Sequence, residues 1–97
     1  MAEKISMEEL IEKVGLVQAV LICSTRTPAI YLDKLTLAEW LGVYNGTSDS
    51  ELGKLALKKI GELAQTFAEG LEMYDKAPFG SKLEKLALKK LVGFVGL

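Results

Sequence analysis

The hexapeptide KLALKK occurs twice in this chain of 97 residues, at 54–59 and 85–90, each time four residues after a serine. Lys, Leu and Ala are strong helix formers, so both copies predict amphipathic helices. The spacing of the two copies also fits a helical repeat, but no third copy lies one period earlier. We therefore interpret the copies as two similar helices rather than as a repeat array.

Capping patterns divide the chain into helices. A Ser or Thr followed three residues later by Glu satisfies free amides at a helix start, because the hydroxyl and the carboxylate each accept a hydrogen bond. This pattern precedes apolar periodicity at four places: Ser6/Glu9, Thr36/Glu39, Ser48/Glu51 and Ser81/Glu84. Four helices are expected.

The stretch 16–32 allows two interpretations. The helix that starts after Ser6 runs into the apolar LVQAVLIC, which continues its helical spacing. Gly15 and the β-branched residues also suit a buried strand at 16–22, which would pair with AIYL at 29–32 through the STRTP turn. Helix throughout and a short β-hairpin at 16–32 both remain open, and Pro28 ends whichever element precedes it.

The other helices have clearer limits. The second is expected over 37–44, ended by Asn45 and Gly46, and the third over 49–74, either unbroken or bent at Gly61 or Gly70. A turn at 77–80 leads into the last helix. The apolar arcs of the last two helices are expected to face the core, including Phe67, Leu71, Tyr74, Leu88, Val92, Phe94 and Val95. The predicted fold is all-α, a compact four-helix bundle forming a single domain, 1–97.

The composition indicates the compartment in which the protein is expected. The single cysteine, Cys23, excludes an internal disulfide and favours a reducing compartment, so a cytoplasmic location is expected. Neither a secretory leader nor an apolar stretch long enough to span a bilayer is visible, which predicts a soluble protein with no membrane partner. Abundant Lys and Glu with few labile residues are typical of thermophiles.

Charge is distributed unevenly along the chain. The net charge is −1, but residues 1–49 carry seven acids against four bases, and residues 76–97 carry five lysines against Glu84. The lysines of the last helix form a stripe without facing acids, as a surface that meets phosphates would. We assign phosphate contact to Lys54, Lys58, Lys82, Lys85 and Lys89, and we add Arg26, the only arginine, from the polar STRTP loop.

A second set of residues suggests a protein contact. On the predicted helices Leu55, Leu86 and Met73 stand outside the main apolar arc, on an off-core stripe. Trp40, the only tryptophan, is first a core candidate and second an anchor for a partner. These four residues form the predicted protein interface, with other subunits or with another copy of the chain.

Enzymatic function is not expected. The chain has no histidine, the usual general base and the commonest zinc ligand, and Cys23 has no adjacent base to activate it. CxxC, Walker and GxGxxG motifs are absent from the sequence, so no cofactor and no metal site are predicted.

Two other functional classes stay open. The segment DKLTLAEWLGV resembles the opening of a helix-turn-helix regulator, although YNGTSDS lengthens the turn and the first turns of the next helix lack Arg, Asn and Gln for base reading. KLALKK together with the tail VGFVGL would also suit an amphipathic protein on a membrane surface.

The whole chain resembles the small helical subunit of archaeal type I-A CRISPR interference complexes, which act in antiviral defence. The resemblance rests on the acidic MEELIEK, then ICSTRTPAIYLDKLTLAEWLG, then two long lysine-bearing helices. It implies a non-catalytic assembly subunit of a ribonucleoprotein that touches guide RNA or single-stranded target DNA through basic helix faces. The KLALKK lysines and Arg26 are the residues that would carry this contact here.

Overall fold

The protein is helical throughout the part that the computed structural model describes, residues 6–47 and 50–96. Helix accounts for 79% of these described residues, and they contain no strand. The elements are α1 (Met7–Val14), α2 (Leu16–Cys23), the 3-10 helix η1 (Ser24–Arg26), α3 (Ala29–Leu32), α4 (Leu37–Thr47), α5 (Glu51–Leu63), α6 (Phe67–Lys76) and α7 (Lys82–Phe94). The all-α prediction is confirmed.

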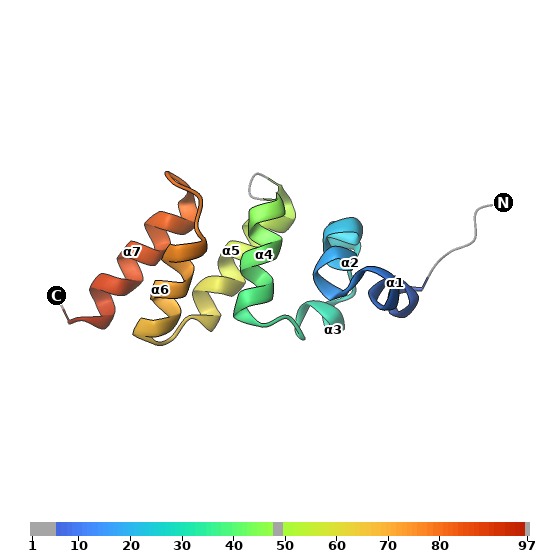
Figure 1. Ribbon diagram of the computed structural model, residues 1–97, viewed down its shortest axis with the longest axis horizontal. Helices are drawn as coiled ribbons and strands as arrows, with labels where there is room; N and C mark the ends of the chain where they lie inside the picture. Colours follow the sequence, from blue (N-terminus) through green and yellow to red (C-terminus); the bar gives the residue numbers. More distant parts are fainter. Residues whose placement is uncertain (1–5, 48–49, 97) are drawn as a thin grey trace.

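Consecutive helices form three pairs, α1–α2, α4–α5 and α6–α7, that follow one another along the longest axis (Figure 1). The principal extents are 58 × 22 × 18 Å. In the third pair α6 runs nearly parallel to α4, and α7 is inclined in the same way as α5 (Figure 1). The predicted four helices around one common axis are therefore not found, because the described residues form seven α-helices arranged as a row.

The row arises because the predicted helix over 49–74 is two helices. Ala64 is extended, and Thr66 starts α6 with a capping box: its hydroxyl accepts from the Glu69 amide while the Glu69 carboxylate accepts from the Thr66 amide. Neither Gly61 nor Gly70 bends the chain. The Thr66/Glu69 pattern stands in the sequence, but it lies within continuous apolar periodicity, which concealed it.

The second predicted helix is also longer than expected. Asn45 and Gly46 do not end it, since α4 continues to Thr47. A Cβ on Gly46 would lie 3.0 Å from Leu21 Cδ2, so this glycine lets α2 approach α4 closely instead of forming a left-handed cap. Ser48 of the predicted Ser48/Glu51 box lies outside the described residues, and Ser50 caps α5 by accepting from the Gly53 amide at 3.1 Å.

Residues 16–32 contain no strand, so the β-hairpin alternative is not found. Gly15, at φ 88°, turns the chain between α1 and α2, and α2 then buries Ala19 and Val20. AIYL forms the short α3 directly after Pro28. The apolar run is helical because both of its faces are used, one against α1 and the other against α4.

The pairs repeat with a regular spacing. The evenly spaced hydroxyls of Ser6, Thr36 and Thr66 accept from the amides of Glu9, Glu39 and Glu69. Helices α5 and α7 each have 13 residues, and Ser50 and Ser81 cap them at equivalent positions. The two KLALKK copies thus occupy the same positions of the equivalent helices α5 and α7, whereas α2 in the first pair has 8 residues and no side-chain cap.

One continuous core runs through the row. Its largest fully buried side chains are Trp40, Leu41, Leu52, Ile60, Met73, Leu83, Val20 and Val43. Ala56 and Ala87, the alanines of the two KLALKK copies, are also completely buried. A small residue at this position allows α5 and α7 to pack closely against the first helix of their own pair.

The capping box of α6 makes stability depend on the ionisation of Glu69. Hydrogen bonds from the Gln65 amide and from Thr66 lower the pKa of this carboxyl from its ordinary value of 4.5. A lowered pKa in the folded state means that the charged form adds stability above the unfolded pKa, and that this stability is lost as the pH falls through the folded pKa. We therefore expect Glu69→Gln to unfold at lower urea concentration than wild type at pH 7, and the two midpoints to converge as the pH falls through the folded-state pKa of Glu69. A constant difference across this range would contradict the assignment.

Candidate nucleic-acid interface

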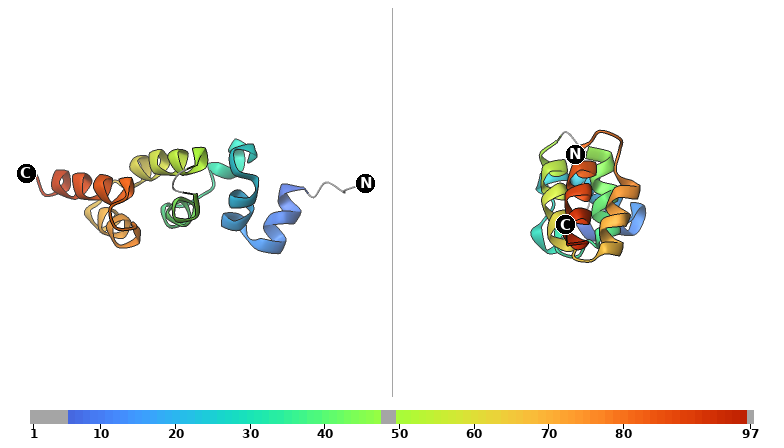
Figure 2. Two further views of the ribbon diagram at one scale, coloured as in Figure 1. Left: turned by 90° about the horizontal axis from the view of Figure 1, so that it is seen from above. Right: turned by 90° about the vertical axis from the view of Figure 1, so that its left-hand side faces the viewer.

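The five predicted phosphate-binding lysines lie on one layer of the structure. Lys54 and Lys58 are exposed on α5, and Lys82, Lys85 and Lys89 are exposed on α7. Because the two hexapeptides share one register, equivalent lysines project from their helices in the same direction. Figure 2 shows α5 and α7 in one layer, with α4 and α6 in the other. Charges that are far apart in the sequence therefore share a face, called here the lysine face.

The last lysine of each hexapeptide has a different, structural role. The ammonium of Lys90 donates to the backbone oxygen of Ala64, 3.0 Å away, and Lys59 lies 3.9 Å from Asp33 Oδ1. Ala64 is the C-cap residue of α5, and Asp33 is the C-cap residue of α3. Lys90 thus binds the C-terminal end of α5, where the helix dipole favours a positive charge, whereas Lys59 forms a long ion pair with a carboxylate.

A cleft opens where α5 and α7 begin. Its volume is about 370 Å³, and it is lined by Tyr44, Gly53, Lys54, Leu57, Pro78, Gly80, Ser81 and Lys82. Lys54 from the second helix pair and Lys82 from the third border this cleft. The positive ends of two helix dipoles are there as well, so the cleft is suited to an anion.

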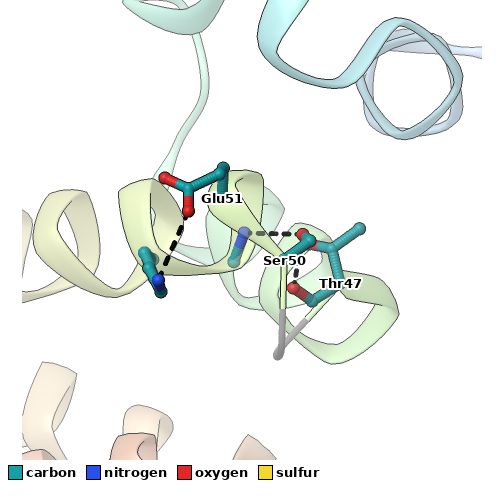
Figure 3. Close-up of polar contacts among 5 residues, drawn as sticks. Thr47, Ser50 and Glu51 are labelled. Atoms are coloured by element: carbon teal, nitrogen blue, oxygen red, sulfur yellow. Dashed lines mark hydrogen bonds and ion pairs between the residues drawn. The ribbon is translucent and has the colours of Figure 1, made fainter.

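Two hydrogen bonds of Ser50 stabilise the start of α5 (Figure 3). Ser50 accepts from the Gly53 amide and donates to the Thr47 carbonyl at 2.8 Å. Lys54 pairs with Glu51 at 3.3 Å, but the two side chains are 66% and 78% exposed. Exposed pairs of this kind are worth at most about 1 kcal/mol, so Lys54 remains free to exchange Glu51 for a phosphate.

Arg26 lies at the end of η1 and is exposed. Since η1 packs against α5, the arginine belongs to a segment next to the helix that carries Lys54 and Lys58. The neighbouring Thr27 is buried and donates to the Ser24 carbonyl at 2.8 Å, which fixes the loop. The structure gives Arg26 no direct contact with the lysines.

The residues of the predicted protein interface are not an exposed stripe. Trp40 and Met73 are core residues, 1% and 0% exposed, and Leu55 and Leu86 are half-buried against the core. Leu86 Cδ2 lies 3.5 Å from the position of a Cβ on Gly61, so it fills the junction between the second and third pairs. The expectation for Met73 was wrong because it assumed one continuous helix, whereas the break at Ala64 changes the phase of α6 relative to α5.

A different set of apolar residues is exposed. Six residues that were expected in the core are 45–54% exposed: Phe67, Leu71, Tyr74, Leu88, Val92 and Val95. Phe94, from the same expected set, is 37% exposed. Helical periodicity identified them as apolar faces but did not reveal that α6 and α7 end the row, with no further described helix beyond them.

Groups that could hold a metal ion and helices that could span a membrane are not found among the described residues. Within 6–47 and 50–96, no group of three or more His, Cys, Asp or Glu side chains is placed to hold a metal ion. In the same part of the chain, every helix is too short or too polar to cross a bilayer.

The second and third helix pairs share their helix lengths, serine caps and stacking, as neighbouring units of an α-helical repeat do. Comparisons with protein-family models, with curated proteins and with solved structures find no match. The functional interpretation therefore depends on the surface of the repeat itself.

The burial of Met73 leads to a test of its role. Met73→Ala should lower the free energy of unfolding by about 2–5 kcal/mol, because it removes a fully buried side chain and leaves a cavity. Ile22→Ala on α2 serves as the control and should cost much less, because this side chain is 61% exposed. Urea unfolding monitored by circular dichroism measures both values, and equal small losses would show that Met73 is outside the core.

Proposed function

We propose that this protein is a non-catalytic assembly subunit that contacts nucleic-acid phosphates through its lysine face. The supporting observation is that the exposed lysines of α5 and α7 lie in one layer of the structure, and that Lys54 and Lys82 border a cleft where these two helices begin. Such contacts depend on charge and not on base identity. The resemblance to the small subunit of type I-A CRISPR complexes implies the same kind of role.

The arrangement favours contact with the phosphate backbone over base reading. The lysine face presents ammonium groups but no Arg, Asn or Gln side chain from α5 or α7, and these are the residues that read base edges. A repeat surface that extends along the row also offers successive contacts to an extended chain. We therefore propose RNA or single-stranded DNA as the partner, within a larger ribonucleoprotein.

The charge of the lysine face can be tested directly. Replacing Lys82, Lys85 and Lys89 with Glu should weaken binding to single strands and duplexes alike and make the affinity less dependent on salt. For each phosphate interaction that the substitutions remove, the log–log slope should fall by about 0.7–0.9. Mobility-shift assays on random single strands and random duplexes at several salt concentrations measure both effects.

A matched control separates the location of the charge from its amount. Replacing Lys13, Lys34 and Lys76, which are exposed outside the lysine face, with Glu also changes the net charge by three times −2, from −1 to −7. The control should retain most of the affinity and slope. Equal losses in both variants, or no binding by wild type at low salt, would refute the proposal. A preference of about a thousandfold for one duplex sequence would instead favour a helix-turn-helix-like regulator.

A further inference from the structure

The outer side of the α6–α7 pair is an apolar face, formed by two stripes with helical spacing. Phe67, Leu71 and Tyr74 line α6, and Leu88, Val92 and Val95 line α7. All six are about half exposed, and both stripes follow the spacing i, i+4, i+7. Because α6 packs against α7, the two stripes together form a candidate interaction surface.

Helix α4 shows the burial of the equivalent residues where a further helix pair follows in the row. Leu41 and Tyr44 in α4 correspond to Leu71 and Tyr74 in α6, yet the first two are 1% and 3% exposed and the second two are 47% and 45% exposed. At the C-cap of α5, the position of Val95 is held by Ala64, which is fully buried. The third pair covers the second, so the uncovered face of the third pair has the composition of a helix-packing surface.

The opposite end of the row is built differently. Helix α1 turns its apolar side toward α2 and leaves Glu8, Glu9, Glu12 and Lys13 exposed. Terminal units of repeat proteins need such a polar outer side to remain soluble. Stacking α1 of one molecule onto α6–α7 of another would bury these charges against apolar side chains, which costs free energy, so open head-to-tail chains are disfavoured.

We infer that a second copy of this chain covers the face, with the two α6–α7 pairs packed symmetrically against each other. An isologous pairing places apolar surface on apolar surface and closes the assembly at two molecules. By helical register, Asp75 borders the face on the α6 side and Lys85 borders it on the α7 side. A two-fold arrangement that sets α6 over the partner's α7 brings these opposite charges together at the rim, where they favour this orientation.

The mass of the protein in solution tests the inference, by size-exclusion chromatography with light scattering. Wild type should be a dimer, and Leu71→Glu with Val92→Glu should be a monomer with an unchanged helical spectrum. We expect the dissociation constant to rise at least about a hundredfold. Ile22→Glu with Ile30→Glu is the matched control, because these residues are 61% and 62% exposed in the first half of the chain and give the same change in charge. This control should stay dimeric.

Other outcomes would overturn the inference. A monomeric wild type, a dimer that persists in the face variant, or oligomers that grow with concentration would each exclude a closed dimer through this face. Should the Glu variant lose its helical spectrum, Leu71→Gln with Val92→Thr keeps nearly the same shape and should still weaken the dimer at least about tenfold. These measurements contain no nucleic acid, so they are independent of the proposed phosphate contact.

Discussion

The capping box between Thr66 and Glu69 is the local interaction on which the architecture depends. Without it, the good helix formers from Glu51 to Lys76 would favour one long helix, because the apolar spacing hardly changes across the junction. The box satisfies amides at a new helix start, so the chain can stop at Leu63 and reverse. Reversal at this point makes α6 the counterpart of α4 and α7 the counterpart of α5, and a row of pairs results.

The repeated hexapeptide follows from this row, since each of its positions has a fixed neighbour. The alanine is completely buried in both copies, and the first leucine packs against the core. The last lysine contacts a residue of an earlier element, Asp33 for Lys59 and Ala64 for Lys90. The remaining lysines face solvent on both copies. Convergence of helix formers would explain the shared residue types, but it would not explain the equal helix lengths and the equivalent serine caps.

Sequence reasoning found what depends on local chemistry. It identified the helical class, three of the capping residues that the structure describes (Ser6, Thr36 and Ser81) and the exposure of the lysines on α5 and α7. Those features follow from hydrogen bonding and amphipathicity within single helices. Met73 and Leu71 were misplaced because their burial depends on non-local structure: the break at Ala64 changes the phase of α6, and Leu71 lies on a face that no described helix covers. In the sequence Gly46 looks like a helix C-cap. Its packing partner, Leu21, belongs to a different helix, so no local pattern reveals this contact.

A row of pairs also separates two surfaces that a bundle would have mixed. In a four-helix bundle the apolar stripes of α6 and α7 would turn inward, and the lysines would surround them on all sides. In the row, stacking proceeds along the long axis, so apolar residues appear at the end while the lysines of α5 and α7 stay on a lateral layer. Contact with a polyanion and contact with a second molecule therefore require different residues. Only Lys85, at the border of both surfaces, is positioned to couple them.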